Sequence, residues 1–240
     1  MSQKTAISCI LDLTSKDLAY FTVLNALKRQ AKVCVFDGRN LLVSDENEHC
    51  LYVIMEDLNT YLSYESLIDY QKYDWVKVYD ETIADYIAKA NHKYRDELLK
   101  IQIAVYTKDE KMAGDFSRIR PLDITYYGVI GAHYEYYDDE ELTNALENQE
   151  VFGYFDDEEL CGFIGFHSDG SIGMFRVFEG HQRKGIGKTL EAYIINKALD
   201  KKMLPFVEVN VLNEASLALQ EKLGLSFSKS YVYWVIQSGH

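Results

Sequence analysis

Basic residues are scarce in this chain relative to acidic ones. Lys and Arg number 25 against 38 Asp and Glu, which gives a formal net charge of -13 over 240 residues. Such a surface repels phosphate backbones and anionic lipid, and it attracts cations over long range. We therefore expect no nucleic-acid partner and no membrane partner, whereas an amine substrate suits this charge.

Long apolar runs are also missing. No stretch reaches the ~18 apolar residues of a membrane-spanning helix. The run Ala6–Leu13 is interrupted by Asp12 before it could serve as the apolar part of a signal peptide. Because 48% of the residues are hydrophobic, the chain can still build a core. The sequence predicts a folded cytoplasmic protein.

Cysteines are few and widely separated. The four of them form no C-x-x-C pair, so we expect buried free thiols, with neither a disulfide framework nor a metal site. Two acidic runs, 138–141 and 156–159, each precede an apolar pattern. We interpret them as a helix start and a hairpin turn rather than as metal ligands.

Proline is nearly absent, and no linker rich in Pro, Gly or Ser marks a domain boundary. The two prolines are Pro121 and Pro205. The segment Lys108–Asp123 mixes charge and glycine between two regions of regular alternation. We therefore predict an N-terminal α/β domain over residues 1–112 and a second domain over residues 117–240.

Apolar periodicity predicts mixed α and β structure in both parts. In the first part the expected helices are 15–30, 58–69 and 81–92, and the expected strands are 32–36, 40–44, 51–55, 75–79 and 98–106. The first two strands form a hairpin around Asp37-Gly38, which suits a tight turn. In the second part the expected helices are 124–134, 139–148, 185–201 and 214–223, and the expected strands are 151–155, 160–166, 172–178, 206–211 and 231–235. Only this second part carries a chemical motif.

The motif is the stretch EGHQRKGIGKTL at 179–190, in which three glycines and three Lys or Arg residues lead into a helix. Glycines before a helix start, with its unpaired N–H groups, make an anion site. A Walker A loop requires Lys and Ser/Thr directly after its second glycine, but Ile186 follows Gly185. A dinucleotide loop requires glycine where Leu190 stands. The remaining fit is Q/R-x-x-G-x-G/A over 182–187.

This pattern resembles the pyrophosphate loop of the GCN5-related N-acetyltransferase (GNAT) superfamily. Residues 119–134 resemble the first strand and helix of that domain, and residues 151–177 resemble its second to fourth strands. Residues 206–227 resemble L-x-V-x-x-x-N-x-x-A-x-x-L-Y-x-K-L-G-F. The residues that align with defined positions of this motif are Val209, Asn213, Ser216, Leu219, Leu223 and Gly224. The resemblance covers about half of the chain, and within the superfamily it is similar to FR47-like and glycine N-acyltransferase-like proteins.

The resemblance implies an α/β (α+β) chain whose C-terminal half has the GNAT fold, with a mixed, mostly antiparallel central sheet. The N-terminal half has the element order of a degenerate copy of the same fold, but it lacks the glycine loop. It is interpreted either as such a copy, which shapes the acceptor pocket or forms a packing partner, or as a diverged structural domain.

The resemblance also implies a bound acyl-CoA, most simply acetyl-CoA, and no metal. Pantetheine would pair with the strand edge near Val177, where a backbone N–H can polarise the thioester carbonyl. The diphosphate would rest on the N–H groups of residues 183–188. The residues predicted to bind the cofactor are Val177, Gln182, Arg183, Lys184, Gly185, Ile186, Gly187, Lys188, Asn213 and Ser216.

Glu208 is the predicted catalytic base. It lies five residues before Asn213, as in the ribosomal-protein alanine acetyltransferases that this segment resembles, and the alternative is a strand Glu that faces solvent or forms a structural pair. In the family Asn213 would bond the coenzyme or an ordered water, and Ser216 would lie near the sulfur. Asn213 is equally a good helix N-cap, and both roles can coexist.

The general acid stays unassigned. The family's usual tyrosine, four residues before Gly224, is replaced by Gln220. Tyr231 and Tyr233 are interpreted as packed aromatics of the last strand. Another acidic position of the family, a Glu early in its fourth strand, reads Ser171 or Ile172 here.

The function that follows is an acyl-CoA-dependent N-acyltransferase acting on a primary amine of a small molecule or peptide, by direct attack in a ternary complex. The alternative is a noncatalytic acyl-CoA-binding sensor or partner-docking module, motivated by Gln220 and the unassigned acid. O-acylation and peptide N-terminal acylation also remain open, as does a homodimer, because acceptor pockets are built from loops without motifs.

Overall fold

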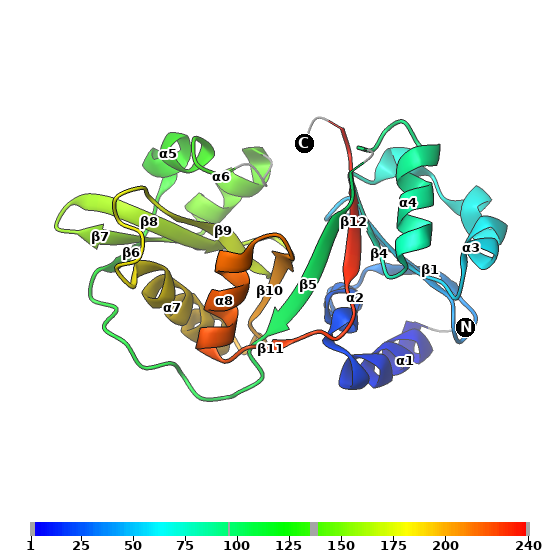
Figure 1. Cartoon of the computed structure of the whole chain (residues 1–240), viewed down its shortest axis with the longest axis horizontal. Coiled ribbons are helices and arrows are strands. Elements are labelled where there is room, and N and C mark those ends of the chain that lie inside the picture. The colour runs from blue at the N-terminus through cyan, green and yellow to red at the C-terminus, as the bar shows by residue number, and fades with distance from the viewer. Residues whose placement is uncertain (1–2, 96, 135–138, 239–240) are drawn as a thin grey trace. The chain divides into compact units, whose positions relative to one another are not determined.

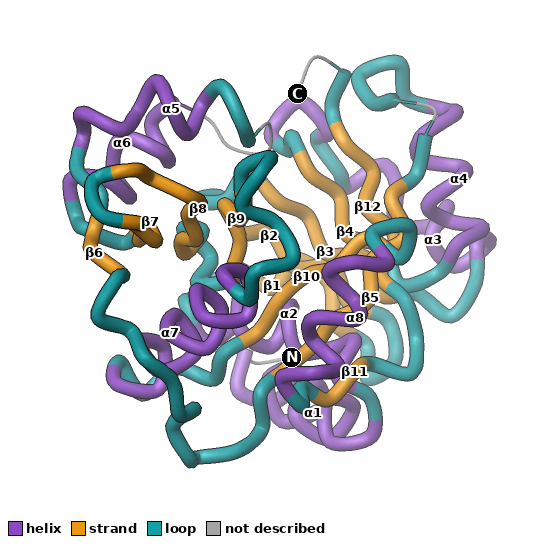
Figure 2. The backbone as a smooth tube through the Cα atoms, turned by 60° about the vertical axis from the view of Figure 1, so that its left-hand side comes forward, coloured by secondary structure: helices purple, strands orange, loops and turns teal. Residues whose placement is uncertain are grey.

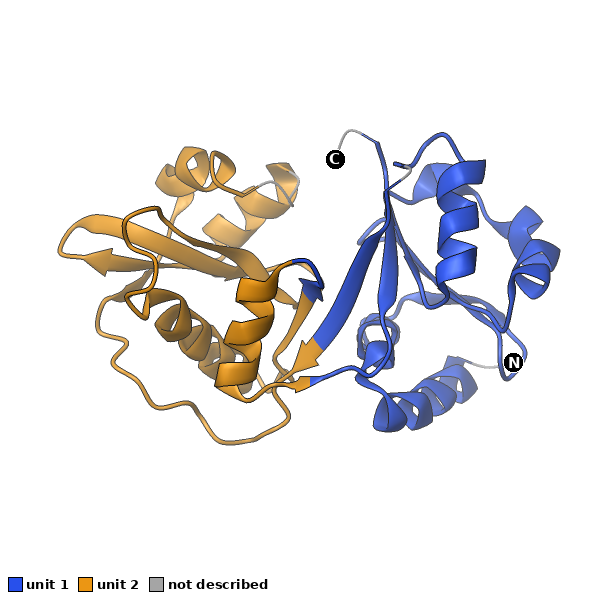
Figure 3. Cartoon of the chain, in the orientation of Figure 1, with its two compact units in different colours: residues 1–103, 209–212, 227–240 blue, residues 104–208, 213–226 orange. Residues whose placement is uncertain are grey.

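The chain forms two compact units (Figure 3). The computed structural model describes residues 3–95, 97–134 and 139–238. Unit 1 comprises residues 1–103, 209–212 and 227–240, and unit 2 comprises residues 104–208 and 213–226. The predicted division into domains at residues 112–117 stays a prediction.

Unit 1 contains the N-terminal helices and most of a large mixed sheet (Figure 1). Its helices are α1 (Gln3–Lys16), α2 (Phe21–Lys28), α3 (Leu58–Tyr64) and α4 (Glu81–Ala90). Its strands are β1 (Lys32–Phe36), β2 (Leu41–Asp45), β3 (Cys50–Ile54), β4 (Trp75–Val78) and β12 (Val232–Ile236). Three further strands contain residues of both units: β5 (Leu99–Val105), β10 (Phe206–Asn210) and β11 (Ser226–Phe227). The strand order is β1-β2-β3-β4-β12-β5-β10, and β11 also pairs with β5.

Helices cover both faces of the central strands of unit 1. Leu41 and Val43 of β2 pack in one core cluster with α1 and α2. Leu42 and Val53 pack in another with α3 and α4. All five residues of β2 and of β3 are consequently buried, so these strands carry near-continuous apolar runs.

The predicted hairpin is confirmed, but the predicted first helix differs. β1 and β2 pair antiparallel on either side of Asp37-Gly38, and Gly38 has φ +105°. The helix expected over 15–30 begins later, because Asp17 is extended and its side chain accepts from the backbone N–H of Ala19 as an N-cap. A separate helix, α1, precedes it and was not predicted.

Unit 2 is built on the antiparallel sheet β6-β7-β8-β9. The strands are β6 (Ile119–Pro121), β7 (Val151–Asp156), β8 (Glu159–Phe166) and β9 (Ile172–Val177), and the helices are α5 (Tyr127–Gly131), α6 (Asp139–Glu147), α7 (Ile186–Asp200) and α8 (Glu214–Leu223). Figure 2 shows α5 and α6 on one side of this sheet and α7 on the other. The expected helix 124–134 is divided between a 3-10 turn at Ile124–Tyr126 and α5.

The two acidic runs take the structural places expected of them. Asp139 opens α6, with Glu140 and Glu141 in its first turn; Asp138 lies outside the described residues. Asp157 has φ +53° in the tight turn between β7 and β8. Three acidic side chains at the start of α6 also suit the positive end of its dipole.

Candidate functional site

β9 forms one edge of the unit 2 sheet and contains a bulge. Gly165 pairs with Gly173, and Phe163 pairs with Arg176. From Gly173 to Arg176 the chain advances three residues on β9, whereas from Gly165 to Phe163 it spans only two on β8. Met174, inside this bulge, has φ +46°. No strand of the described chain pairs with the other edge of β9. Backbone groups on that edge can accordingly pair with an extended ligand.

The loop after β9 prepares an open helix N-terminus. Arg183 and Gly185 have φ +60° and +85°, and Gly185 is the N-cap of α7, where no side chain caps the helix. An ideal Cβ at Gly185 would meet no heavy atom within 4 Å. Lys184 and Lys188 are exposed on either side of it. Uncapped N–H groups, the helix dipole and three cationic side chains together favour a multiply charged anion.

Gln182 links this loop to the strand edge. Its side-chain Nε2 donates to the backbone carbonyl of Val177 over 3.2 Å. Val177 is the last residue of β9 and pairs with Gly162 of β8. The predicted strand-edge residue and the first residue of the predicted phosphate loop are thus in direct contact.

Gly187 allows α7 to approach β9 and α8 closely. An ideal Cβ there would lie 3.1 Å from Cζ of Phe175, 3.6 Å from Cγ2 of Val177 and 3.9 Å from Cδ2 of Leu219. Ile186, its neighbour, is buried and anchors the first turn. Two predicted positions of the loop therefore serve packing, which fixes the helix N-terminus beside β9.

Asn213 and Ser216 lie at the start of α8. Asn213 Oδ1 accepts from the backbone N–H of Ser216 over 3.1 Å, so the N-cap role of Asn213 is confirmed. Asn213 is exposed and Ser216 is half-buried. Their predicted contacts with the coenzyme stay predictions.

Glu208 lies on β10, as predicted, and is half-buried. Its neighbours along the strand, Val207 and Val209, are both buried. Alternation along a strand therefore turns Glu208 to the side of β10 opposite these two valines.

Gln220, at the position of the family's tyrosine, is buried and belongs to a polar pair inside unit 2. Its Nε2 donates to Oε1 of Glu191 on α7 over 2.5 Å, and each side chain is 1% exposed. Glu191 Oε2 and Gln220 Oε1 have no hydrogen-bond partner among the described residues. If Glu191 carries a proton on Oε2, this oxygen can donate a hydrogen bond to Oε1 of Gln220. Burial raises the pKa of Glu191 to about 7, against the lowering effect of the Gln220 hydrogen bond.

The two tyrosines of the last strand take packing roles within unit 1. Tyr233 donates to Glu81 over 2.8 Å, and the ammonium of Lys100 lies 4.3 Å from the ring centre of Tyr231. Ser171 and Ile172 are both buried at the start of β9. None of these four side chains fills the missing acid position.

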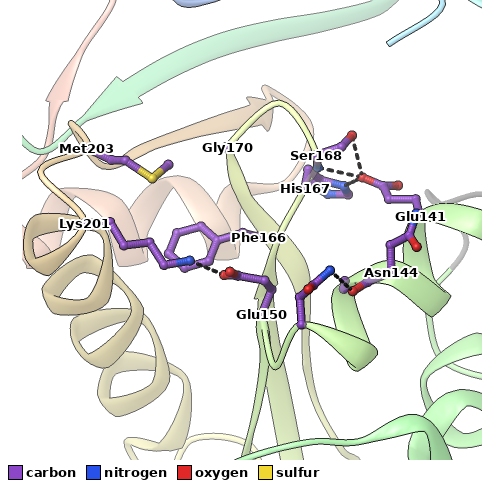
Figure 4. Close-up of a pocket in the computed structure, with 11 residues that line it drawn as sticks. Glu141, Asn144, Glu150, Phe166, His167, Ser168, Gly170, Lys201 and Met203 are labelled. Carbon is purple, nitrogen blue, oxygen red and sulfur yellow. Dashed lines mark hydrogen bonds and ion pairs between the residues drawn. The ribbon is translucent and has the colours of Figure 1, made fainter. Parts of the chain in front are cut away.

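A polar cluster that the sequence did not predict lies between α6 and the β8–β9 turn. His167 Nδ1 lies 2.9 Å from Glu141 Oε1, and His167 Nε2 lies 3.0 Å from the hydroxyl of Tyr134. Glu141 also accepts from the backbone N–H of Ser168 over 3.1 Å. Figure 4 shows Glu141, His167 and Ser168 along the wall of a pocket of about 290 Å³. Lys201 and Glu150 form an ion pair across it.

Opposite charges on His167 and Glu141 stabilise this cluster with the imidazole protonated and the carboxyl group ionised. Burial alone would lower the pKa of His167, but Tyr134 and Glu141 outweigh it and raise that pKa well above the usual value. Burial alone would raise the pKa of Glu141, but hydrogen bonds from His167 and Ser168 hold it below its usual range. An imidazolium beside a carboxylate is therefore the resting state near neutral pH.

Two features are absent from the part of the chain that the structure describes. It contains no group of three or more His, Cys, Asp or Glu side chains able to hold a metal ion. In the same residues, no helix is both long and apolar enough to cross a bilayer.

The second half of the chain matches a known family model. The model described as the acetyltransferase (GNAT) family matches residues 116–225. This range contains β9, the loop after it, α7 and Glu208. A search of the curated proteins found no match.

Solved structures share the fold over nearly the whole chain. A Drosophila melanogaster protein is 14% identical with a TM-score of 0.66, and the alignment covers 99% of this chain and 97% of that one. A GNAT-family putative acetyltransferase from Novosphingobium aromaticivorans is 12% identical with a TM-score of 0.58, over 89% and 95% of the two chains. A GCN5-related N-acetyltransferase-like protein from Streptococcus suis is 14% identical with a TM-score of 0.54, over 90% and 93%. At these identities the likeness concerns the fold, and it agrees with the expected mixed, mostly antiparallel architecture.

Proposed function

Because residues 116–225 belong to the acetyltransferase (GNAT) family, we propose that this protein transfers acetyl from acetyl-CoA to a primary amine of a small molecule or peptide. The observation that supports the proposal best is the uncapped N-terminus of α7 beside the unpaired edge of β9. The helix N-terminus suits a diphosphate, and the strand edge suits the amides of pantetheine. Together they fit a ligand that carries both groups.

The residues present fit coenzyme A at both ends. At the loop, open space before Gly185 and the exposed side chains of Arg183, Lys184 and Lys188 would receive the phosphates. At the strand, the bulge at Met174 turns the backbone of β9 out of regular register, so that an N–H can serve a carbonyl oxygen. Bound acetyl-CoA supplies the acyl group as an activated thioester.

Glu208 is proposed to accept a proton from the attacking amine. An alkylamine with a pKa near ~10.4 is mostly protonated at neutral pH, so its nitrogen loses two protons on the way to an amide, and Glu208 is proposed to take the one that leaves as the C–N bond forms. A half-buried carboxylate on β10 can accept a proton while it remains accessible to substrate.

The departing thiolate depends less on a general acid than the attacking amine depends on a general base. A thiol has a pKa of ~8.5, so its thiolate is a tolerable leaving group. The burial of Gln220 against Glu191 is therefore compatible with transfer by direct attack in a ternary complex. No covalent intermediate on the protein is proposed.

Replacement of the base gives a first test. Glu208→Gln keeps the size of the side chain but removes its basicity, so we expect kcat to fall roughly 100-fold or more. Acetyl-CoA affinity, measured by calorimetry, should change little. The matched control is Glu147→Gln at the exposed end of α6. Unchanged turnover at saturating amine would show that Glu208 is not the base.

A further inference from the structure

The cluster of Glu141, His167 and Tyr134 is a continuous hydrogen-bonded chain. The two ring nitrogens of His167 contact one partner each, at 2.9 Å for Glu141 and 3.0 Å for Tyr134. The side chains of Glu141 and His167 are 15% and 19% exposed. A carboxylate, an imidazole and a phenol linked in this order can pass a proton in either direction.

This chain touches the backbone of β9 at its bulge. An ideal Cβ at Gly173 would collide with Nε2 of His167, so the imidazole lies directly against the main chain there. Gly173 and Met174 are consecutive residues of the bulge, and Met174 is buried in the cluster formed with α5 and α6. His167 thus lies on the α5 and α6 side of the strand segment that is proposed to hold the acyl group.

The opposite side of β9 is covered by α7. There α7 lies so close at Gly187 that an ideal Cβ on this glycine would lie 3.1 Å from Phe175 and 3.6 Å from Val177. An amine that approaches the bulge from the side opposite α7 meets His167, which lies against Gly173 there. At its other end the chain reaches the pocket of Figure 4, which Glu141 and His167 line.

The groups that face His167 set its charge. They are Glu141 from α6, Tyr134 after α5, and Asp169 in the β8–β9 turn, with the Lys201 and Glu150 pair across the pocket. The resting imidazole is protonated at neutral pH, so it accepts a further substrate proton only after it has released its own to the pocket.

We propose that the Glu141–His167–Tyr134 chain removes the first proton of an alkylammonium acceptor and releases it to solvent through the pocket. The inference rests on the proposed acetyl transfer. Tyr134 accepts a proton from the ammonium as it donates its own to the neutral His167, and the imidazolium then loses a proton to water. The free amine next attacks the thioester: the C–N bond forms, the C–S bond breaks, and Glu208 carries the second nitrogen proton to the thiolate. One ammonium and one thioester thus yield one amide, one thiol and one released proton.

The test combines imidazole titration by ¹⁵N NMR with pH–rate profiles. Acetyl-CoA at saturation should shift the His167 ring resonances, which His167→Asn assigns by their loss. Glu141→Gln should move the His167 titration to lower pH, and it should move the acidic limb of the rate with benzylamine in the same direction. O-benzylhydroxylamine, a similar primary amine that is uncharged at neutral pH, should lack this limb. His167→Asn should lower the benzylamine rate about 100-fold.

Glu140→Gln is the matched control, because it makes the same change one residue away at an exposed position of α6. It should move neither the titration nor the rate profile. A benzylamine limb that stays in place when Glu141→Gln moves the His167 titration would overturn the proposal. His167 ring resonances that do not shift when acetyl-CoA is added would also overturn the proposal, even if neither amine is turned over. Absence of turnover together with an acetyl-CoA-responsive His167 would instead count against the proposed function for these acceptors, while it supports the placement of the chain at the acyl site.

Discussion

Gly185→Glu is expected to weaken acetyl-CoA binding at least ~100-fold, because a carboxylate would stand where the diphosphate is proposed to bind and like charges brought together cost several kcal/mol. The site of the substitution has room, since no heavy atom lies within 4 Å of an ideal Cβ there. The change therefore acts through charge and backbone preference rather than through a steric clash. Calorimetric titration with acetyl-CoA measures the effect.

Gly38→Glu is the control for this experiment. Gly38 also has a positive φ, +105°, and open space around an ideal Cβ, but it lies in the β1–β2 turn of unit 1. The variant carries the same added charge and a comparable backbone strain. If both variants lose affinity equally, or if Gly185→Glu retains the wild-type affinity, the phosphates do not bind at the N-terminus of α7.

The second large effect concerns the stability of unit 2 as a function of pH. Burial raises the pKa of Glu191 to about 7 from 4.5 in the unfolded chain. A raised folded-state pKa contributes stability that is complete below pH 4.5 and is lost progressively as the pH rises to about 7. The loss is on the order of 3 kcal/mol at about 1.4 kcal/mol per pKa unit.

Glu191→Gln should remove this dependence. Two amides side by side at positions 191 and 220 can form hydrogen bonds at any pH. As the pH rises from 4.5 to about 7, the unfolding free energy of the wild type should therefore fall relative to that of the variant. Urea unfolding followed by circular dichroism between pH 5 and 8 measures it. Glu221→Gln, an exposed position on α8, should run parallel to the wild type. A Glu191→Gln curve that also runs parallel would mean that Glu191 is ionised in the folded protein.

Local signals in the sequence were sufficient for most of the secondary structure. The Asp37-Gly38 turn and the side-chain cap of α4 by Asp80 act within a few residues, so their effects can be read without the fold. α1 gave a weaker signal, because only Ala6 and Ile10 of its residues are buried. A stripe that narrow does not produce the broad apolar face of a typical amphipathic helix.

The predicted phosphate loop was accessible to sequence analysis for the same reason. Its glycines, cations and helix start lie within one short segment, 182–188. The chain of Glu141, His167 and Tyr134 joins residues 26 and 33 positions apart, without a motif. Gly173 was its one hint, since a glycine inside a strand often marks close approach of another group.

Glu191 and Gln220 illustrate a different limit. A departure from the family's tyrosine was visible at Gln220, but its partner was not, because the pairing depends on how α7 packs against α8. The available signal was a charged residue next to Leu190 on a helix whose neighbouring positions are buried. Buried carboxyl groups are uncommon, so an acidic residue at such a position indicates a polar partner inside the fold.

Acetyl transfer itself is the central claim, and mass spectrometry tests it most directly. The purified protein is mixed with acetyl-CoA and a panel of primary amines, and both the acetylated amine and the free thiol are measured. The proposal predicts that acetylated amine and free thiol appear in equal amounts, and that both decrease with Gly185→Glu. Binding of acetyl-CoA without thiol release for any amine would contradict it, and the protein would then be better described as a noncatalytic acyl-CoA-binding module.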